Sequence, residues 1–379
     1  MDFNFTQEQQ QFADALRRWV DKDYGFETRK KIVHSEKGVS DEAWATLVEL
    51  GMTALPIPEE QGGFNGSAID MMVVMHEMGR GLVVEPYLAT VIGAEFLKRG
   101  GGHDDLLEKI ASGEAKLASA LGEKQSRYEL FDVATTAKAD GGGFVLNGSK
   151  AVVIHGGQAD TLIVSARTSG AQRDTDGISL FVVPADATGV TRRDYRTIDC
   201  QHAADITFAD VKLPAASLLG KLDAGWSTLD AVSDYAAALL CAEAVGAMEA
   251  LNGATLEYLK TRQQFGVPLG KFQALQHRMA EMYMEMEQAR SMATLVAVKV
   301  GSSDDNERRR IASAAKARVG QAMKVVGQQA VQLHGGMGVT DELPAAHHFK
   351  RLTMIEASFG DIDHHLARFT SLPEFRKIA

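Results

Sequence analysis

Apolar residues in the last third of the chain recur at steps of three and four over long stretches, and this pattern constrains the fold more than any other. The longest stripe contains Leu275, Met279, Met282, Met286, Ala289, Ala293, Val296 and Val300. Two shorter stripes have the same spacing: Leu229, Val232, Ala236 and Leu239, and Ala315, Val319, Ala322 and Val326. Helices that are apolar along one side and joined by short connections pack as antiparallel bundles. The sequence therefore predicts a C-terminal four-helix bundle.

The middle of the chain has short β-branched runs in place of the helical spacing. In the segment Phe144–Ile154, the pair Asn147-Gly148 stands between two apolar runs, which favours a tight hairpin turn. Further strands are expected at Thr161–Ala166, Ile178–Val183 and Asp205–Phe208. Regularly spaced short strands predict a small antiparallel β-barrel or sandwich.

The first third is helical again, with Phe12, Leu16 and Trp19 on one face and a second helical run at Ile69–Met78. The expected fold class is therefore an α+β multidomain protein. Its expected domains are an N-terminal helical domain at residues 1–114, a middle β domain at 115–222 and a C-terminal helical bundle at 223–379.

Charge, cysteine content and apolar runs argue against several classes of function. The formal net charge of −10 argues against nucleic acid or an anionic membrane as the main partner. The two cysteines, Cys200 and Cys241, suggest no disulfide framework, and no apolar run approaches the roughly 20 residues that span a bilayer. Because the N-terminus is polar and unlike a signal peptide, we expect a cytoplasmic protein.

Two motifs in the last third carry chemistry. The first is Arg262-Gln-Gln-Phe-Gly-Val-Pro-Leu269, followed by Phe272-Gln-Ala-Leu-Gln-His277; an Arg at a helix end can aim its planar donors at a diphosphate. The second is Gln332-Leu-His-Gly-Gly-Met-Gly-Val-Thr340, whose glycines let backbone amides approach a ligand. Taken singly, the first motif is better explained as an ordinary helix end, and the second is equally well explained as one.

Taken together, the two motifs resemble those of the acyl-CoA dehydrogenase family. The resemblance covers the whole chain: Leu55-Pro-Ile-Pro-Glu-Glu-Gln-Gly-Gly63 is similar to the family's first loop, and Ile206-Thr-Phe-Ala-Asp-Val-Lys-Leu-Pro214 to its last β-domain strand. Within the family, Gly62-Gly-Phe-Asn-Gly66 and Glu77-Met-Gly-Arg-Gly-Leu-Val-Val-Glu-Pro-Tyr-Leu-Ala89 are most similar to small subunits of the pimeloyl-CoA dehydrogenase type.

The resemblance implies an FAD-dependent enzyme that dehydrogenates an acyl-CoA between its α and β carbons. In the family a carboxylate removes the α proton while a hydride passes to the flavin, and an electron-transfer flavoprotein accepts the electrons. The implied cofactor-binding residues are Arg262, Gln264, Phe265, Gln273, Gln332, Gly335 and Gly336. In the family these positions serve the dinucleotide end of the FAD bound by a neighbouring subunit.

The sequence departs from the family where the catalytic base is expected. The two positions that carry the base in different family members are Phe359 and Ala236 here, and neither side chain can accept a proton. Asp361 is the better of two nearby carboxylates, because Asp234, two positions before Ala236, is expected to face away. The structural alternative for Asp361 and Asp234 is that each is a surface or helix-capping carboxylate.

Two flavin-facing features are altered as well. The segment Leu121–Glu129 stands in place of the family's flavin loop, and Val152 stands where the family has a Trp. These changes predict a base-lacking subunit of a heteromeric enzyme. The alternatives are a self-sufficient homomeric flavoenzyme with a displaced base and a non-catalytic structural partner.

For several other residues we prefer a structural role over a functional one. The Met-rich helix could line an acyl pocket but is better explained as a core stripe. The pairs His347-His348 and His364-His365 predict no metal site, because adjacent histidines on a helix point about 100° apart. Arg308-Arg-Arg310 is expected to be a solvated helix face. The identity of the acyl chain does not follow from the sequence.

Overall fold

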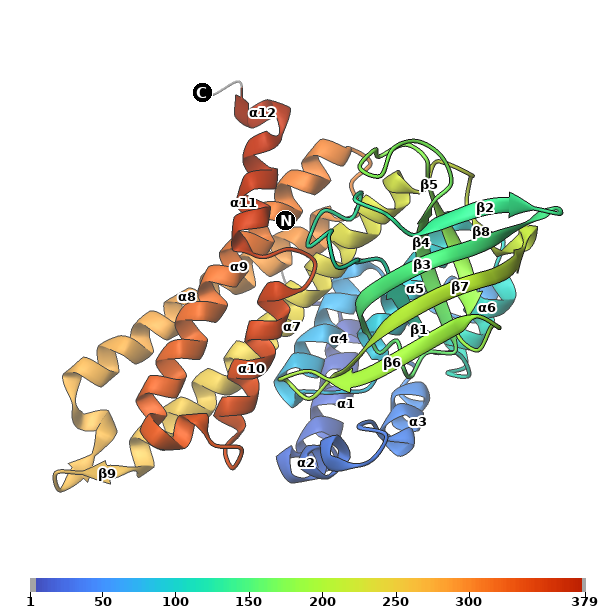
Figure 1. Ribbon diagram of the computed structural model, residues 1–379. Coiled ribbons are helices and arrows are strands. Elements are labelled where there is room, and N and C mark those ends of the chain that lie inside the picture. The colour runs from blue at the N-terminus through green and yellow to red at the C-terminus, as the bar shows by residue number, and fades with distance from the viewer. Residues whose placement is uncertain (1–4, 377–379) are drawn as a thin grey trace. The chain divides into compact units, whose positions relative to one another are not determined.

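The computed structural model describes residues 5–376, and its elements follow the order helices, sheet, helices (Figure 1). The first helices are α1 (Gln7–Lys22), α2 (Phe26–His34), α3 (Asp41–Glu49), α4 (Ala68–Gly81), α5 (Tyr87–Gly100) and α6 (Asp104–Ala111), with a 3-10 turn η1 at Glu59–Gln61. This order confirms the expected three-part fold.

The strands that follow are β1 (Leu117–Ala120), β2 (Thr136–Asp140), β3 (Gly143–Ile154), β4 (Thr161–Arg167), β5 (Ile178–Pro184), β6 (Val190–Arg196), β7 (His202–Pro214) and β8 (Leu218–Leu219), with the turn η2 at Ala215–Ser217 between β7 and β8. The last part contains α7 (Trp226–Thr261), β9 (Gln263–Gln264), β10 (Val267–Pro268), η3 (Leu269–Lys271), α8 (Gln273–Lys299), α9 (Asp305–His334), η4 (Gly335–Val339), α10 (Pro344–Ala357), α11 (Ile362–Ser371) and α12 (Pro373–Arg376).

The chain divides into two compact units. The first contains Met1–Lys31, Ala68–Val83 and Asp234–Ala379, and the second contains Ile32–Ser67 and Val84–Ser233. The domain limits expected from the sequence remain predictions.

The second unit is built on one eight-stranded sheet with the order β6-β7-β3-β2-β4-β5-β8, with β1 added to β4. Neighbouring strands are antiparallel except at β1–β4 and at the single β2–β4 pair, which are parallel. One side of the sheet forms a continuous apolar core that includes Leu146, Leu162, Phe181, Ile206 and Phe208. The expected strands at 161–166, 178–183 and 205–208 all belong to this sheet.

The hairpin expected at Asn147-Gly148 is wrong. These residues lie inside β3, where the pairing with β7 shifts register between Leu146 and Gly148. Asn147 exchanges hydrogen bonds with Asp210 of β7 at 2.9 and 3.0 Å, which fixes it as a bulge. The β2–β3 turn falls instead at Gly141-Gly142, where both φ angles are positive.

The first unit is a helical bundle, as expected. α8 and α9 run side by side, and α10 and α11 pack against α9 (Figure 1). Asp304 caps α9 by accepting the backbone N–H groups of Asn306 and Glu307, as its position before the helix predicts. On α8, Met282 and Met286 are buried in the bundle, which agrees with a core stripe. Met284 is 55% exposed, so the core stripe expected for the Met-rich helix is wrong there.

α4 and α7 cross in direct backbone contact. A Cβ atom on Gly246 of α7 would lie 1.8 Å from the carbonyl oxygen of His76, and one on Gly79 of α4 would lie 1.9 Å from the carbonyl oxygen of Glu243. Neither glycine can therefore carry a side chain without separating the helices.

α7 is the one described helix long and apolar enough to cross a membrane by length and composition, but 94% of its most apolar window is buried within the protein. Such burial is typical of the core helix of a folded bundle.

Candidate functional site: a cationic groove at the end of the bundle

A groove of about 590 Å³ lies where α7 and α9 end. It is lined by Tyr258, Arg262, Gln264, Leu269, Leu275, Arg278, Gln332, Leu333, His334, Gly335, Gly336 and Met337. α7 stops at Thr261 because the chain turns into the β9–β10 hairpin, in which Phe265 and Gly266 have positive φ angles. α9 stops at His334 because Gly335 also takes a positive φ angle.

The groove is cationic and its rim is open. Among its described lining residues, two are arginines and none carries a carboxylate. Arg262 is exposed, and its guanidinium forms no hydrogen bond or ion pair with the described residues. A Cβ atom on Gly335 or Gly336 would meet nothing within 4 Å, so the backbone there is accessible to a ligand.

The side of the groove next to the glycines is rigid. The rings of Tyr258 and His334 stack at 4.5 Å with an interplanar angle of 29°. His334 is buried, and its Nδ1 lies 2.8 Å from the carbonyl oxygen of Ala330. The end of α9 is therefore held to α7 before any ligand binds.

Most of the cofactor-binding residues predicted from the sequence meet here. Arg262, Gln264, Gln332, Gly335 and Gly336 all line the groove.

Phe265 and Gln273 do not line it. The Phe265 ring is 92% exposed and touches the Phe272 ring edge-on at 6.1 Å. Phe265 lies in the exposed turn between β9 and β10. Arg278 was missed by the sequence analysis, since it belongs to neither motif; its place on the groove depends on the packing of α8 against α9.

The groove fits the diphosphate end of FAD. Arg262 offers an exposed guanidinium without a partner among the described residues, and the open space at Gly335 and Gly336 lets a diphosphate approach the backbone closely. The N–H of Gly335 itself donates to the carbonyl oxygen of Gln332. Arg262 and Gln332 would hold the diphosphate beside Gly335 and Gly336.

The segment around Phe359 is the one in which the resemblance would place the catalytic base. Phe359 has a φ angle of 52°, and its carbonyl oxygen accepts a hydrogen bond from Nε2 of His365 at 2.9 Å. The buried Lys316 donates from Nζ to the carbonyl oxygens of Glu356 and Gly360, at 3.0 and 2.8 Å. Burial lowers the pKa of Lys316 to about 8. This loop is thus held through its carbonyl groups.

The two candidate carboxylates have structural roles. Asp361 caps α11 by accepting the backbone N–H of His364 at 2.8 Å. Asp234 is only 1% exposed, so a surface position is wrong for it. It binds two guanidinium groups, with Nε of Arg308 at 2.9 Å and Arg368 bound to both carboxylate oxygens.

Arg308 is also 5% exposed, so the solvated face expected for Arg308–Arg310 is wrong at its first residue. Arg308 is buried because it pairs with Asp234, which lies 74 positions earlier in the chain. Local sequence pattern does not indicate a pairing between residues so far apart. Ala236, the second base position, is fully buried.

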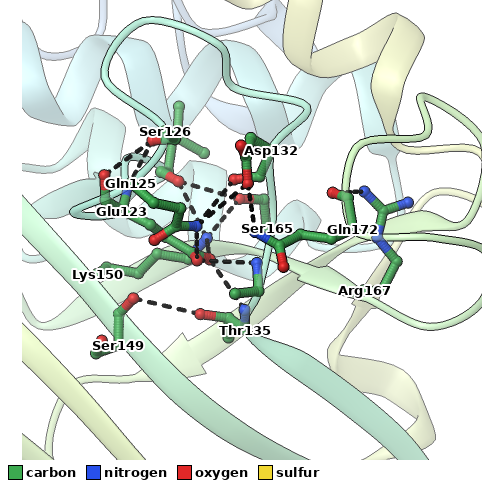
Figure 2. Close-up of polar contacts among 12 residues, drawn as sticks. Glu123, Gln125, Ser126, Asp132, Thr135, Ser149, Lys150, Ser165, Arg167 and Gln172 are labelled. Atoms are coloured by element: carbon green, nitrogen blue, oxygen red, sulfur yellow. Dashed lines mark hydrogen bonds and ion pairs between the residues drawn. The ribbon is translucent and has the colours of Figure 1, made fainter.

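In the second unit, the segment that replaces the flavin loop closes over a buried ion pair. Lys150 Nζ donates to Glu123 Oε1 at 2.8 Å and to Ser165 Oγ at 3.0 Å (Figure 2). The Glu123 carboxylate also accepts the backbone N–H groups of Ala134 and Thr135, at 2.9 and 3.1 Å. One carboxylate therefore connects both ends of the segment between β1 and β2, residues 121–135, to β3.

The pair is ionised at neutral pH. Burial opposes the charge on Glu123, but the Lys150 ammonium and the loop donors outweigh burial and lower the pKa of Glu123 to about 2. Burial lowers the pKa of Lys150 to about 8, against the pull of Glu123.

Val152, which stands at the family's Trp position, is 53% exposed and has a φ angle of 54°. It lies at a second register shift, between Lys150 and Val153 of β3. Its backbone N–H donates to Asp205 at 3.2 Å. The strand therefore presents a small side chain on a strained bulge.

No group of three or more metal-binding side chains occurs among residues 5–376. Nδ1 of His347 lies 3.1 Å from Nη1 of Arg29, and Nε2 of His365 binds the carbonyl oxygen of Phe359. Burial lowers the pKa of His348 to about 3 and that of His365 to about 2.

Comparison with known proteins accounts for the order of helices, sheet and helical bundle. Family models for acyl-CoA dehydrogenases match in the same order: the N-terminal domain at residues 6–114, the middle domain at 118–211 and the C-terminal domain at 223–368.

Individual relatives agree. The chain is 30% identical over 371 residues to the probable acyl-CoA dehydrogenase YngJ of Bacillus subtilis, covering 95% of this chain and 96% of that one. Its fold matches butyryl-CoA dehydrogenase from Megasphaera elsdenii with a TM-score of 0.89 at 26% identity, covering 98% and 99% of the chains. It also matches a chain of the ChsE4-ChsE5 complex from Mycobacterium tuberculosis with a TM-score of 0.87 at 26% identity, covering 98% of each.

This chain belongs to the acyl-CoA dehydrogenase family, whose members are FAD-dependent oxidoreductases that act on acyl-CoA.

Proposed function

We propose that this chain is the base-lacking subunit of a heteromeric acyl-CoA dehydrogenase. In this role its groove completes the dinucleotide end of an FAD site on a catalytic partner of the same family. The observation that carries the proposal is the contrast between two parts of the first unit. The groove residues Arg262 and Gln332 are exposed, whereas Asp361, the carboxylate nearest the usual base position, caps a helix.

The chemistry divides accordingly between the two chains. FAD supplies hydride acceptance at its N5 atom when bound. The partner would supply the carboxylate that removes the α proton of the acyl-CoA. This chain would supply the positive charge of Arg262 and the side-chain amide of Gln332 to the diphosphate, which lower the free energy of cofactor binding without touching the reacting carbons.

Two relationships support a heteromer over a homomer. The chain resembles pimeloyl-type small subunits, and one of its structural neighbours comes from a complex of two differently named chains. The exposed Val152 also gives this chain no indole to place against a flavin ring.

We further propose a cytoplasmic location, with an electron-transfer flavoprotein as acceptor. The acyl group remains open, since Ala236–Ala238 would allow a bulky chain or close helix packing.

An assembled state is supported by apolar side chains that this chain leaves exposed. Met284, Leu295 and Val298 are 55%, 41% and 38% exposed and lie on one side of α8, since they are separated by 11 and 3 positions. Exposed apolar residues aligned along a helix are typical of an interface. We expect sedimentation to show a dimer or a dimer of dimers, and a stable monomer at micromolar concentration would contradict this.

The decisive experiment is co-expression with the neighbouring reading frame, followed by native mass and flavin stoichiometry. The proposal predicts a complex of both chains that is yellow. A yellow, active complex of this chain alone would instead support the homomeric enzyme with a displaced base. A colourless complex would support a purely structural subunit.

A further inference from the structure

We propose that Arg278 is a second phosphate-binding residue of the groove and that it makes the groove selective for a diphosphate over a monophosphate. This inference rests on the proposed function, because it concerns the same groove. It adds a residue that lies outside both sequence motifs.

The position of Arg278 follows from the packing of two helices. Arg278 lies in the second turn of α8 and lines the groove together with Arg262, which follows the end of α7. Its Nη1 donates to Oε1 of Gln329 on α9 at 3.1 Å. Gln329 stands three positions before Gln332, so the two glutamines lie on the same face of α9. The bond to Gln329 therefore holds the second guanidinium beside the Gln-Gly-Gly end of that helix.

The charge of the groove determines what Arg278 can bind. No carboxylate lines the groove among the described residues, so neither arginine is neutralised within it. A guanidinium has five donors, and the single bond to Gln329 leaves donors of Arg278 available. Two guanidinium groups from different helices match two linked phosphates, whereas one phosphate can engage only one of them well.

The ligand class that fits is a nucleotide with a diphosphate, such as FAD or ADP, rather than FMN or AMP. Lys in place of Arg278 would keep the charge but lose the planar donor fork. Replacement by Gln would remove the charge while keeping a polar side chain of similar length.

The test uses the full chain and measures binding of ADP and AMP by calorimetry at low and at moderate salt. We expect the unmodified chain to bind ADP about tenfold more tightly than AMP, which corresponds to one charge-assisted contact. R278Q should bring the two affinities to within about twofold of each other, and R278K should fall between. The matched control is R318Q, which removes an α9 arginine that pairs with Glu285 outside the groove.

The outcomes separate this inference from the function it rests on. If the unmodified chain and the co-expressed complex both fail to bind ADP or FAD, the proposed function fails. If ADP binds with the expected preference and R278Q leaves that preference unchanged, the assignment of Arg278 is wrong while the proposed function stands. Circular dichroism of R278Q should match that of the unmodified chain, and the ADP/AMP ratio is insensitive to a small loss of folded protein.

Discussion

The carboxylate of Asp361 accepts the backbone N–H of His364 at 2.8 Å, so the acidic side chain nearest the usual base position is the cap of α11. A cap and a base make different demands on this side chain. A cap needs only an acceptor oxygen, which Asn also provides, whereas a base needs a carboxylate that can take a proton.

Asp361→Asn should therefore leave turnover of the assembled complex unchanged within about twofold, while loss of a true base would cost about 10²–10⁴-fold. Asp361→Ala should lower the free energy of unfolding by about 1 kcal/mol through loss of the cap. Steady-state kinetics and urea denaturation measure the two effects. Abolished turnover in Asp361→Asn with FAD still bound would identify Asp361 as the base.

Removal of the Arg262 side chain should weaken FAD retention. A charge-assisted contact to a diphosphate is worth roughly 1.5–3 kcal/mol, so Arg262→Ala should raise the FAD dissociation constant of the complex about 10- to 150-fold. Flavin absorbance after gel filtration and a fluorescence titration would measure this. Arg18→Ala, at an exposed arginine of α1, is the control. Equal flavin content in both variants would show that Arg262 does not bind FAD and only marks the end of a helix.

The crossing of α4 and α7 predicts opposite effects of one substitution at two glycines of α7. Gly246→Ala places a Cβ atom 1.8 Å from the carbonyl oxygen of His76 and should destabilise the protein by about 1–3 kcal/mol or more. At Gly253 nothing lies within 4 Å of the added atom, so Gly253→Ala should stabilise by about 0.5–1 kcal/mol. Thermal denaturation of both variants checks the contrast, and similar shifts in both would show that the helices do not touch there.

The buried pair of Glu123 and Lys150 predicts a dependence of stability on pH. The pKa of Glu123 is lowered from 4.5 to about 2, so its stabilising contribution is complete above pH 4.5 and is lost as the pH falls toward 2. The shift corresponds to at most ~3 kcal/mol. The stability difference between the unmodified chain and Glu123→Gln should thus shrink as the pH falls from 5 to 3.

The comparison with Glu123→Gln is necessary because Glu77 and Glu249 also have pKa values lowered to about 2. These carboxyl groups lower the acid stability of both proteins equally. Urea midpoints at four pH values would measure the difference. A constant difference across this range would mean that Glu123 is not ionised in the folded protein.

Lys150→Met should lower the free energy of unfolding by about 3–5 kcal/mol at neutral pH, because it leaves the carboxylate of Glu123 buried without its partner.

The sequence was sufficient for features that depend on local pattern. The spacing of Met282, Met286 and Ala289 predicted a core helix, and Asp304 before a helical run predicted its cap. The two motifs named Arg262, Gln332 and Gly335 as cofactor-binding residues, and all three line the groove.

Features that depend on distant partners could not be predicted. Asn147-Gly148 has the chemistry of a turn, but its bonds to Asp210 make it a bulge. Asp234 and Arg308 look like surface residues until the bundle brings them together.

The central claim is that this chain completes a cofactor site but lacks the base. The most direct test is acyl-CoA turnover with an artificial electron acceptor, measured for the purified chain loaded with FAD and for its complex with the neighbouring gene product. We predict negligible turnover by the chain alone, and turnover by the complex that disappears when the partner's carboxylate base is replaced. Turnover by the purified chain at a rate comparable to that of the complex would contradict the account.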